Sequence, residues 1–165
     1  MGYIGNSPAL NESVTAAQIA ASAYAKTKIH EYPLDADTNV DGNTTGTYLS
    51  CVVTPSSSTS KLYAFHYAWG SQGSSGTTTI YPYLSVSGDD VTNIDRALGE
   101  MRARQNAVVN FLWAYTSEEI LLDGTGTADV TFAHKCVSDH ANNTTAFQGN
   151  NQMGSLTHTS ILEIY

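Results

Sequence analysis

The stretch KLYAFHYAW, residues 61–69, decides the fold class of this chain. Its side chains alternate between two faces, with the period of two that an extended β-strand requires. One face carries Leu62, Ala64, His66 and Ala68, and the other carries Tyr63, Phe65, Tyr67 and Trp69. Because both faces are bulky, the pattern predicts a strand that lies between two surfaces.

Runs of the same kind continue on both sides of this strand. β-Branched and aromatic residues dominate residues 47–53, 77–86, 107–115, 127–135 and 159–165, with shorter runs at 119–122 and 146–148. Clusters of Gly, Ser, Asn and Asp separate these runs, as turns separate strands in an antiparallel sandwich. We therefore expect an all-β fold, an antiparallel β-sandwich of the jelly-roll type, over residues 31–165. Residues 89–104 stay ambiguous, because Ile94, Leu98 and Met101 keep a helical spacing that Gly99 interrupts.

Residues 1–30 differ from this pattern and predict a short N-terminal attachment arm, helical or extended. An Ala-rich helix over residues 14–24 is too short and too weakly apolar to be stable alone. It needs a partner surface, either another protein or copies of itself; the alternative is a helix folded back on its own domain. The residues expected to anchor the arm are Tyr3, Ile4, Pro8, Leu10, Val14 and Ile19. Pro33 and the acidic residues 35–41 mark the expected boundary loop.

The charge balance excludes one class of partner. Seven Lys and Arg residues stand against fifteen Asp and Glu residues, which gives a formal net charge of -8. A surface of this sign does not neutralise phosphates, so we expect no nucleic-acid partner. No run approaches the roughly 18 apolar residues that span a bilayer, and the first ten residues lack the basic start of a secretory signal. We therefore expect neither membrane insertion nor export.

The chain also holds ten Tyr, four Phe and two Trp, more apolar ring surface than its few charged residues cover. Two interpretations remain open: core and subunit interface, or a lectin-like surface on which aromatic rings stack against host glycan. The candidate glycan-binding residues are Tyr67, Trp69, Tyr81 and Tyr83. The last strand runs apolar to its end, so we expect it in a sheet or at a subunit contact. The residues expected there are Ile161, Leu162, Ile164 and Tyr165.

One segment matches the start of a calcium-binding loop. Asp37, Asn39 and Asp41, followed by Gly42, fill the first six positions of the pattern D-x-[DN]-x-[DN]-G. The twelfth position is Tyr48, where a bidentate Glu is needed, and a strand rather than a helix is expected to follow. Because Asp, Asn and Gly are common in turns, this is a weak calcium candidate, and we expect no metal or cofactor.

No residue set predicts catalysis, and we expect a protein that is not an enzyme. Residues 138–140 read Ser-Asp-His, but a hydrolase needs three groups that converge in space, and no G-x-S-x-G elbow is present. His66 and His134 lack the spacing of metal ligands and are expected to be satisfied inside strands. Cys51 and Cys136 are expected to be buried free thiols, with a disulfide between them as the alternative.

Three segments carry a resemblance to a known family: TPSSSTSKLYAFHYAWG (residues 54–70), NFLWAYTSEEILLDGTGTADVTFAHKC (residues 110–136) and SLTHTSILEIY (residues 155–165). They resemble small bacteriophage structural proteins with a trimeric jelly-roll head, similar in fold to tumour necrosis factor and the globular heads of complement. In that group a Thr-Pro-x-Ser-x-x-Ser turn leads into a core strand, and a Leu-Asp-x-x-Gly-Thr stretch precedes a Thr-rich strand. The resemblance implies a homotrimer.

The opening MGYIGNSPALNESVTAAQIA (residues 1–20) resembles the start of tail-fibre and appendage proteins of short-tailed marine phages. In such proteins this segment is an arm that attaches to the particle through tail or capsid proteins. Relatives often continue with tandem repeats before the head, whereas residues 26–33 here lead almost directly into the β region. The resemblance implies a virion protein assembled in the host bacterial cytoplasm, either a short tail fibre or a capsid surface knob, whose head serves host attachment.

Overall fold

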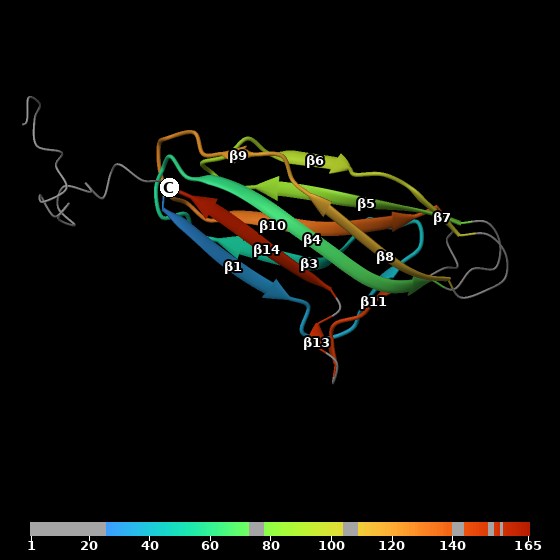
Figure 1. Ribbon diagram of the computed structural model, residues 1–165. Coiled ribbons are helices and arrows are strands. Elements are labelled where there is room, and N and C mark those ends of the chain that lie inside the picture. Colours follow the sequence, from blue (N-terminus) through green and yellow to red (C-terminus); the bar gives the residue numbers. More distant parts are fainter. Residues whose placement is uncertain (1–25, 73–77, 104–108, 140–143, 152–153, 156) are drawn as a thin grey trace, which may run out of the picture.

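The computed structural model describes residues 26–72, 78–103, 109–139, 144–151, 154–155 and 157–165. Within these ranges the chain forms two antiparallel sheets that pack face to face, and none of the described residues is helical (Figure 1). The predicted all-β antiparallel sandwich is therefore confirmed.

Sheet A is built around β4, which pairs with strands along both of its edges. Its seven strands are β1 (Thr27–Pro33), β2 (Thr38–Asp41), β4 (Lys61–Gln72), β8 (Val109–Thr116), β9 (Ile120–Leu121), β11 (Thr144–Phe147) and β14 (His158–Ile164). One edge of β4 pairs with β14, which pairs in turn with β1. The other edge pairs with β8 and β9, while the end of β4 pairs with β11 and through it with β2.

Sheet B covers the other side of the core. Its strands are β3 (Gly46–Val53), β5 (Thr78–Ser87), β6 (Ile94–Ala97), β7 (Met101–Ala103) and β10 (Val130–Ser138). β10 lies between β3 and β5, and β5 pairs with β6 and β7. A separate short pair joins β12 (Asn150–Asn151) to β13 (Gly154–Ser155). The strands β3, β4, β5, β8, β10 and β14 fall alternately in sheets B and A, which is the crossing pattern of a jelly roll.

The structure moves two of the boundaries that the sequence predicts. β1 pairs with β14 from Thr27 onward, so residues 27–30, predicted as part of the arm, belong to the sandwich, and Pro33 ends a strand rather than opening a loop. The ambiguous residues 89–104 contain β6 and β7 and no helix within their described part. Gly99 lies between these two strands, where it interrupts the helix-like spacing of Ile94, Leu98 and Met101.

The core lies between the sheets and is filled by alternate side chains of each strand. β10 shows the pattern over its whole length, with every second residue from Val130 to Ser138 buried. The largest side chains with almost no exposed surface are Phe132, Phe147, Leu62, Ile80 and Ile161. Cys51 and Cys136 are buried free thiols, as predicted.

A buried carboxylate joins two of the three segments that carried the family resemblance. Glu163 of β14 points to the turn between β3 and β4, where its Oε1 accepts hydrogen bonds from the Ser56 N–H (2.5 Å) and the Ser60 hydroxyl (2.7 Å). Its Oε2 accepts from the Ser56 hydroxyl and lies 3.1 Å from His30 Nε2. Burial raises the pKa of Glu163, but these hydrogen bonds outweigh it, and the net pKa is lowered. The carboxylate therefore stabilises the turn that starts β4.

Candidate functional site

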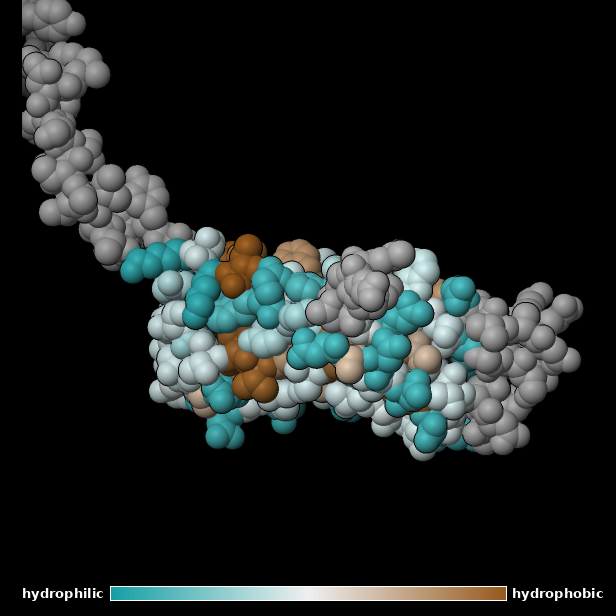
Figure 2. Space-filling model, turned by 90° about the horizontal axis from the view of Figure 1, so that it is seen from below, coloured by the Kyte–Doolittle hydropathy of each residue, from teal (hydrophilic) through white to brown (hydrophobic). Residues whose placement is uncertain are grey.

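The outer face of sheet A, meaning the side chains of β1, β4, β8, β9 and β14 that point away from the core, is apolar and exposed. Its exposed apolar side chains are Ile29 (62% exposed), Leu112 (60%), Leu121 (55%), Phe65 (45%), Tyr67 (41%) and Trp69 (37%). Figure 2 shows the molecule from below, with separate apolar side chains that reach the surface among hydrophilic ones. Because a contiguous apolar patch on a folded protein marks an interaction surface, this face is the candidate functional site.

The pairing register explains why these side chains lie side by side. On β4, Phe65, Tyr67 and Trp69 are two residues apart and therefore share one face. Trp69 lies opposite Leu112 of β8, while Phe65 and Tyr67 lie opposite the small side chains Thr116 and Ala114. On the other edge of β4, Phe65 lies opposite Ser160 of β14.

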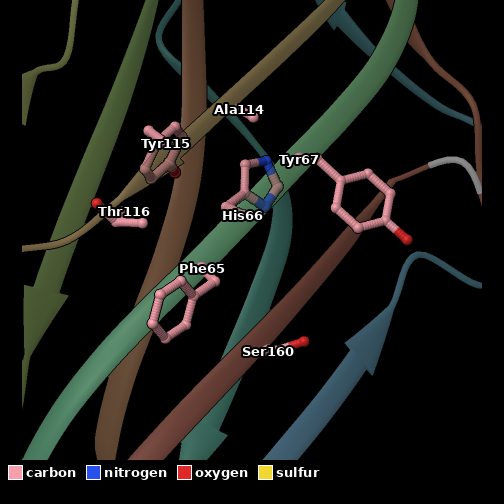
Figure 3. A pocket seen from close by; sticks show the side chains of 7 residues that line it. All are labelled: Phe65, His66, Tyr67, Ala114, Tyr115, Thr116 and Ser160. Carbon is pink, nitrogen blue, oxygen red and sulfur yellow. The ribbon is translucent and has the colours of Figure 1, made fainter.

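These small neighbours leave a groove beside the aromatic rings. The groove has a volume of about 510 Å³ and is lined by Phe65, His66, Tyr67, Ala114, Tyr115, Thr116 and Ser160. Figure 3 shows that its walls come from three adjacent strands, β8, β4 and β14. The groove is thus a depression in the outer face of sheet A and not a separate site elsewhere on the molecule.

The outer face carries few charges. Lys61 and Glu31 are the charged side chains on the outward positions of its strands, and they have opposite signs. Lys61 lies 3.2 Å from Glu119 at the rim. Glu31 accepts a hydrogen bond from the Ser160 hydroxyl (2.7 Å) and also contacts His158, and these two interactions lower the pKa of its carboxyl. The face is therefore close to neutral in a chain of formal charge -8.

Of the four residues predicted as subunit contacts, three reach the surface of the molecule and one is buried in the core. Leu162 and Ile164 point outward from β14 onto the outer face of sheet A, and Tyr165 is exposed at the end of the strand. Ile161 points inward and is fully buried between the sheets, so its prediction as a contact to another copy is wrong. Because successive side chains of a strand point to opposite sides of the sheet, Ile161 faces the core while Leu162 faces outward.

The candidate glycan-binding residues do not form one site. Tyr67 and Trp69 lie on the outer face of sheet A, whereas Tyr81 and Tyr83 point outward from β5 of sheet B. The core between the two sheets separates the pairs. The four rings therefore do not form a single surface.

The weak calcium candidate also fails on geometry. β2 extends through Thr38–Asp41, so Asn39 and Asp41 lie along an extended strand that Asp37 immediately precedes, and the three side chains do not wrap around a point. Asp37 Oδ1 already accepts a hydrogen bond from the Gly149 N–H (2.9 Å). Among the described residues no cluster of His, Cys, Asp and Glu could hold a metal ion. An EF-hand loop needs its ligands to converge, so this segment is a strand end and not a calcium loop.

Several sequence candidates lie outside the described residues. These are the anchor residues Tyr3, Ile4, Pro8, Leu10, Val14 and Ile19, together with His140 of the Ser-Asp-His segment. Asp139 Oδ1 accepts a hydrogen bond from the Thr79 N–H (2.7 Å), which places it at the start of β5 in a structural role. In the part of the chain that is described, no helix has the length and apolar character needed to cross a membrane.

One polar cluster was not predicted from the sequence. His66 of sheet A and His134 of sheet B stack in the core, with ring centroids 4.1 Å apart and an interplanar angle of 12°. The Thr159 hydroxyl lies between them, 2.8 Å from His66 Nδ1 and 3.0 Å from His134 Nε2. Burial lowers the pKa of His134 to about 3 and, with the neighbouring imidazole, lowers that of His66 well below its usual value. Both histidines are therefore satisfied strand residues, as expected, but they also contact each other across the core.

Comparisons with known proteins identify the fold but no family. No protein-family model matches the chain, and no curated protein is significantly similar to it. It is similar to a chain in the structure of infectious bursal disease virus Gt strain, with a TM-score of 0.51 and 13% identity over 84% of this chain and 37% of that chain. A VP2 subviral particle of infectious bursal disease virus is also similar, with a TM-score of 0.46, 14% identity and coverage of 84% and 37%.

The chain thus spans little more than a third of the length of these viral chains. At such low identity the similarity establishes the fold alone, a β-sandwich of a kind found in a virus particle.

Proposed function

We propose that the chain is a virion structural protein whose β-sandwich heads associate as a homotrimer through the outer face of sheet A, and whose N-terminal arm attaches them to a phage tail or capsid. The observation that carries the proposal is the exposed apolar face in a chain of formal charge -8. The similarity of the fold to a chain from a virus particle supports the virion role. The resemblance to trimeric phage heads supports three copies.

A second copy of the chain suits this face because the face is nearly neutral. Two molecules that each carry a charge of -8 repel one another over most of their surface, so they meet at least electrostatic cost where charges are few. The exposed rings and aliphatic side chains present several hundred Å² per copy. A standard stable interface buries about 800 Å² on each partner, which this face approaches when its half-buried neighbours Leu162 and Ile164 are included.

The interface is tested by a matched pair of Lys substitutions. Leu112→Lys places a charge on the outer face of sheet A, and Val52→Lys places the same charge at a similarly exposed apolar residue (47% exposed) of sheet B. Because both residues point to solvent in the single chain, neither change disturbs the core. In sedimentation velocity, Leu112→Lys is expected to sediment as a monomer and Val52→Lys as a trimer. Equal behaviour of the two variants would contradict the proposed interface.

The arm is tested by a deletion. A chain that starts at Lys26 keeps all of β1 and the backbone hydrogen bonds between Lys26 and Tyr165. We expect it to fold, to retain its circular dichroism spectrum and to be absent from purified particles. Incorporation at the level of the full chain would show that residues 1–25 are not the anchor.

A lectin-like activity is the second candidate, favoured by the groove beside Phe65 and Tyr67. Aromatic rings next to a hydroxyl group are suited to stacking on sugar rings and hydrogen bonding to their hydroxyls. Tyr67→Ala should then abolish binding on a glycan array, whereas Tyr81→Ala on sheet B should not. A wild-type head that binds no glycan would exclude this candidate and leave the structural role intact.

A further inference from the structure

The buried histidine pair belongs to a ring of five side chains that joins the two sheets through four hydrogen bonds. Tyr48 of β3 contacts His66 Nε2 (2.9 Å), and His66 Nδ1 contacts Thr159. Thr159 contacts His134 Nε2, and His134 Nδ1 contacts the Tyr115 hydroxyl. The Tyr115 and Tyr48 hydroxyls, at the two ends of this series of hydrogen bonds, interact electrostatically and complete the ring of side chains. His66, Tyr115 and Thr159 belong to sheet A, and Tyr48 and His134 belong to sheet B.

The protons of this ring suffice for its hydrogen bonds when both imidazoles are neutral. The three hydroxyls carry one proton each and each neutral imidazole carries one on nitrogen, which gives five protons for the four hydrogen bonds. The indole N–H of Trp113 donates to the Tyr48 hydroxyl (3.3 Å) and adds no proton that needs a place within the ring. Each neutral imidazole donates once and accepts once.

A sixth proton, added to either imidazole, turns both of its nitrogens into donors, so a hydroxyl that donated to that imidazole must find another acceptor. A backbone hydrogen bond at His158 favours the protonated form of His66, but burial and the neighbouring imidazole outweigh it, and the net pKa of His66 is lowered. The added charge is also buried, because His66 and His134 are 2% and 0% exposed. A buried charge is tolerated when an opposite charge faces it, so the neighbouring groups decide the outcome.

The described groups that face the pair provide no counter-ion. The titratable groups on the inward positions of the surrounding strands are His30 and Tyr32 of β1, Tyr48 and Cys51 of β3, Tyr115 of β8, Cys136 of β10 and Glu163 of β14. The inward positions of β5 are apolar. Glu163 is four residues from Thr159 along the strand, roughly 13 Å, and is held by the turn at Ser56 and Ser60. His158 points to the opposite side of sheet A, where it contacts Glu31.

We propose that this ring is an acid-sensitive lock between the two sheets, which holds the head closed while both imidazoles are neutral and opens it in mildly acidic medium. The unfolded chain takes up protons on both histidines near pH 6.5, whereas the folded ring excludes them. Stability is therefore complete above pH 6.5 and falls as the pH drops toward the lower values of the folded state. For each pH unit by which the pH falls in this window, protonation of one histidine in the unfolded chain raises the unfolding equilibrium constant up to about tenfold. Protonation of both histidines raises it up to about a hundredfold per pH unit.

The test compares urea unfolding of the full chain at pH 7 and pH 5. In wild type the unfolding constant should rise about 600-fold more between these pH values than in the double variant His66→Gln/His134→Gln. Glutamine keeps one donor and one acceptor but does not titrate. His158→Gln, which removes an imidazole on the opposite side of sheet A, is the matched control and should keep the wild-type dependence. Equal pH dependence of wild type and the double variant would overturn the proposal.

A second measurement applies if the double variant does not fold. The imidazole proton resonances of His66 and His134 in folded wild type should not shift between pH 7.5 and the acid unfolding transition. A titration of either resonance near pH 6.5 within the folded state would overturn the proposal, because it would show that the ring accepts the added proton.

Discussion

Replacing Glu163 by Gln tests the physical reasoning about the buried carboxylate most sharply. The carboxylate has no exposed surface and takes part in four hydrogen bonds with Ser56, Ser60 and His30. The amide of Gln is almost the same size, so no cavity forms, but its NH₂ group meets the donors that now bond to Oε2. Loss of charge assistance at two hydrogen bonds costs about 1 kcal/mol each, or about 2 kcal/mol of the free energy of unfolding. In a domain of this size the melting temperature should fall by about 4–8 °C.

The assay is thermal and urea unfolding, followed by tryptophan fluorescence and circular dichroism. Glu119→Gln is the matched control, because Glu119 is an exposed rim carboxylate that contacts Lys61, and it should leave the stability nearly unchanged. The pH dependence gives a further check. The pKa of Glu163 is lowered in the folded chain, so its contribution is present above pH 4.5 and is lost as the pH falls below that value. A Glu163→Gln variant as stable as wild type at pH 7 would refute the reasoning.

Two other predictions concern the core. Gly70→Ala should lower the free energy of unfolding by about 1–3 kcal/mol in urea titrations, because a Cβ there would lie 2.4 Å from Phe111 and 2.6 Å from the Ala146 carbonyl oxygen. Gly99→Ala is the control and should not lower it, because a Cβ at Gly99 meets no atom within 4 Å. Equal losses of stability in the two variants would contradict this packing. Burial raises the pKa values of the Cys51 and Cys136 thiols to about 12. These thiols should therefore resist a thiol reagent at pH 8 until the chain is unfolded. Rapid labelling of the folded chain would contradict their burial.

The sandwich could be predicted because the strand period is visible in the sequence. Alternation over residues 61–69 and in the other runs depends on which side chains face the core, and that is a local property of each strand. β2 was missed because Thr38, Asn39 and Asp41 have turn-like composition, and their strand geometry comes from pairing with β11. In residues 94–101 a spacing of three or four residues also fits two short strands separated by Gly99.

The candidate site could be predicted in part. The aromatic face of β4 was visible from alternation, but its neighbours on β8 and β14 depend on the pairing register. Ile161 and Leu162 have the same apolar character, so composition did not show that they point to opposite sides of sheet A. The histidine ring was not predictable, because Thr159 lies 93 residues from His66 and 25 from His134, and the fold alone brings them together.

The native mass of the full wild-type chain in solution tests the central claim most directly. Light scattering coupled to size exclusion chromatography is expected to give about three times 17.6 kDa, because the proposed trimer would bury the exposed outer face of sheet A between copies. A mass of 17.6 kDa at micromolar concentration would contradict the account, since it would show that the exposed apolar face does not bring copies of this chain together.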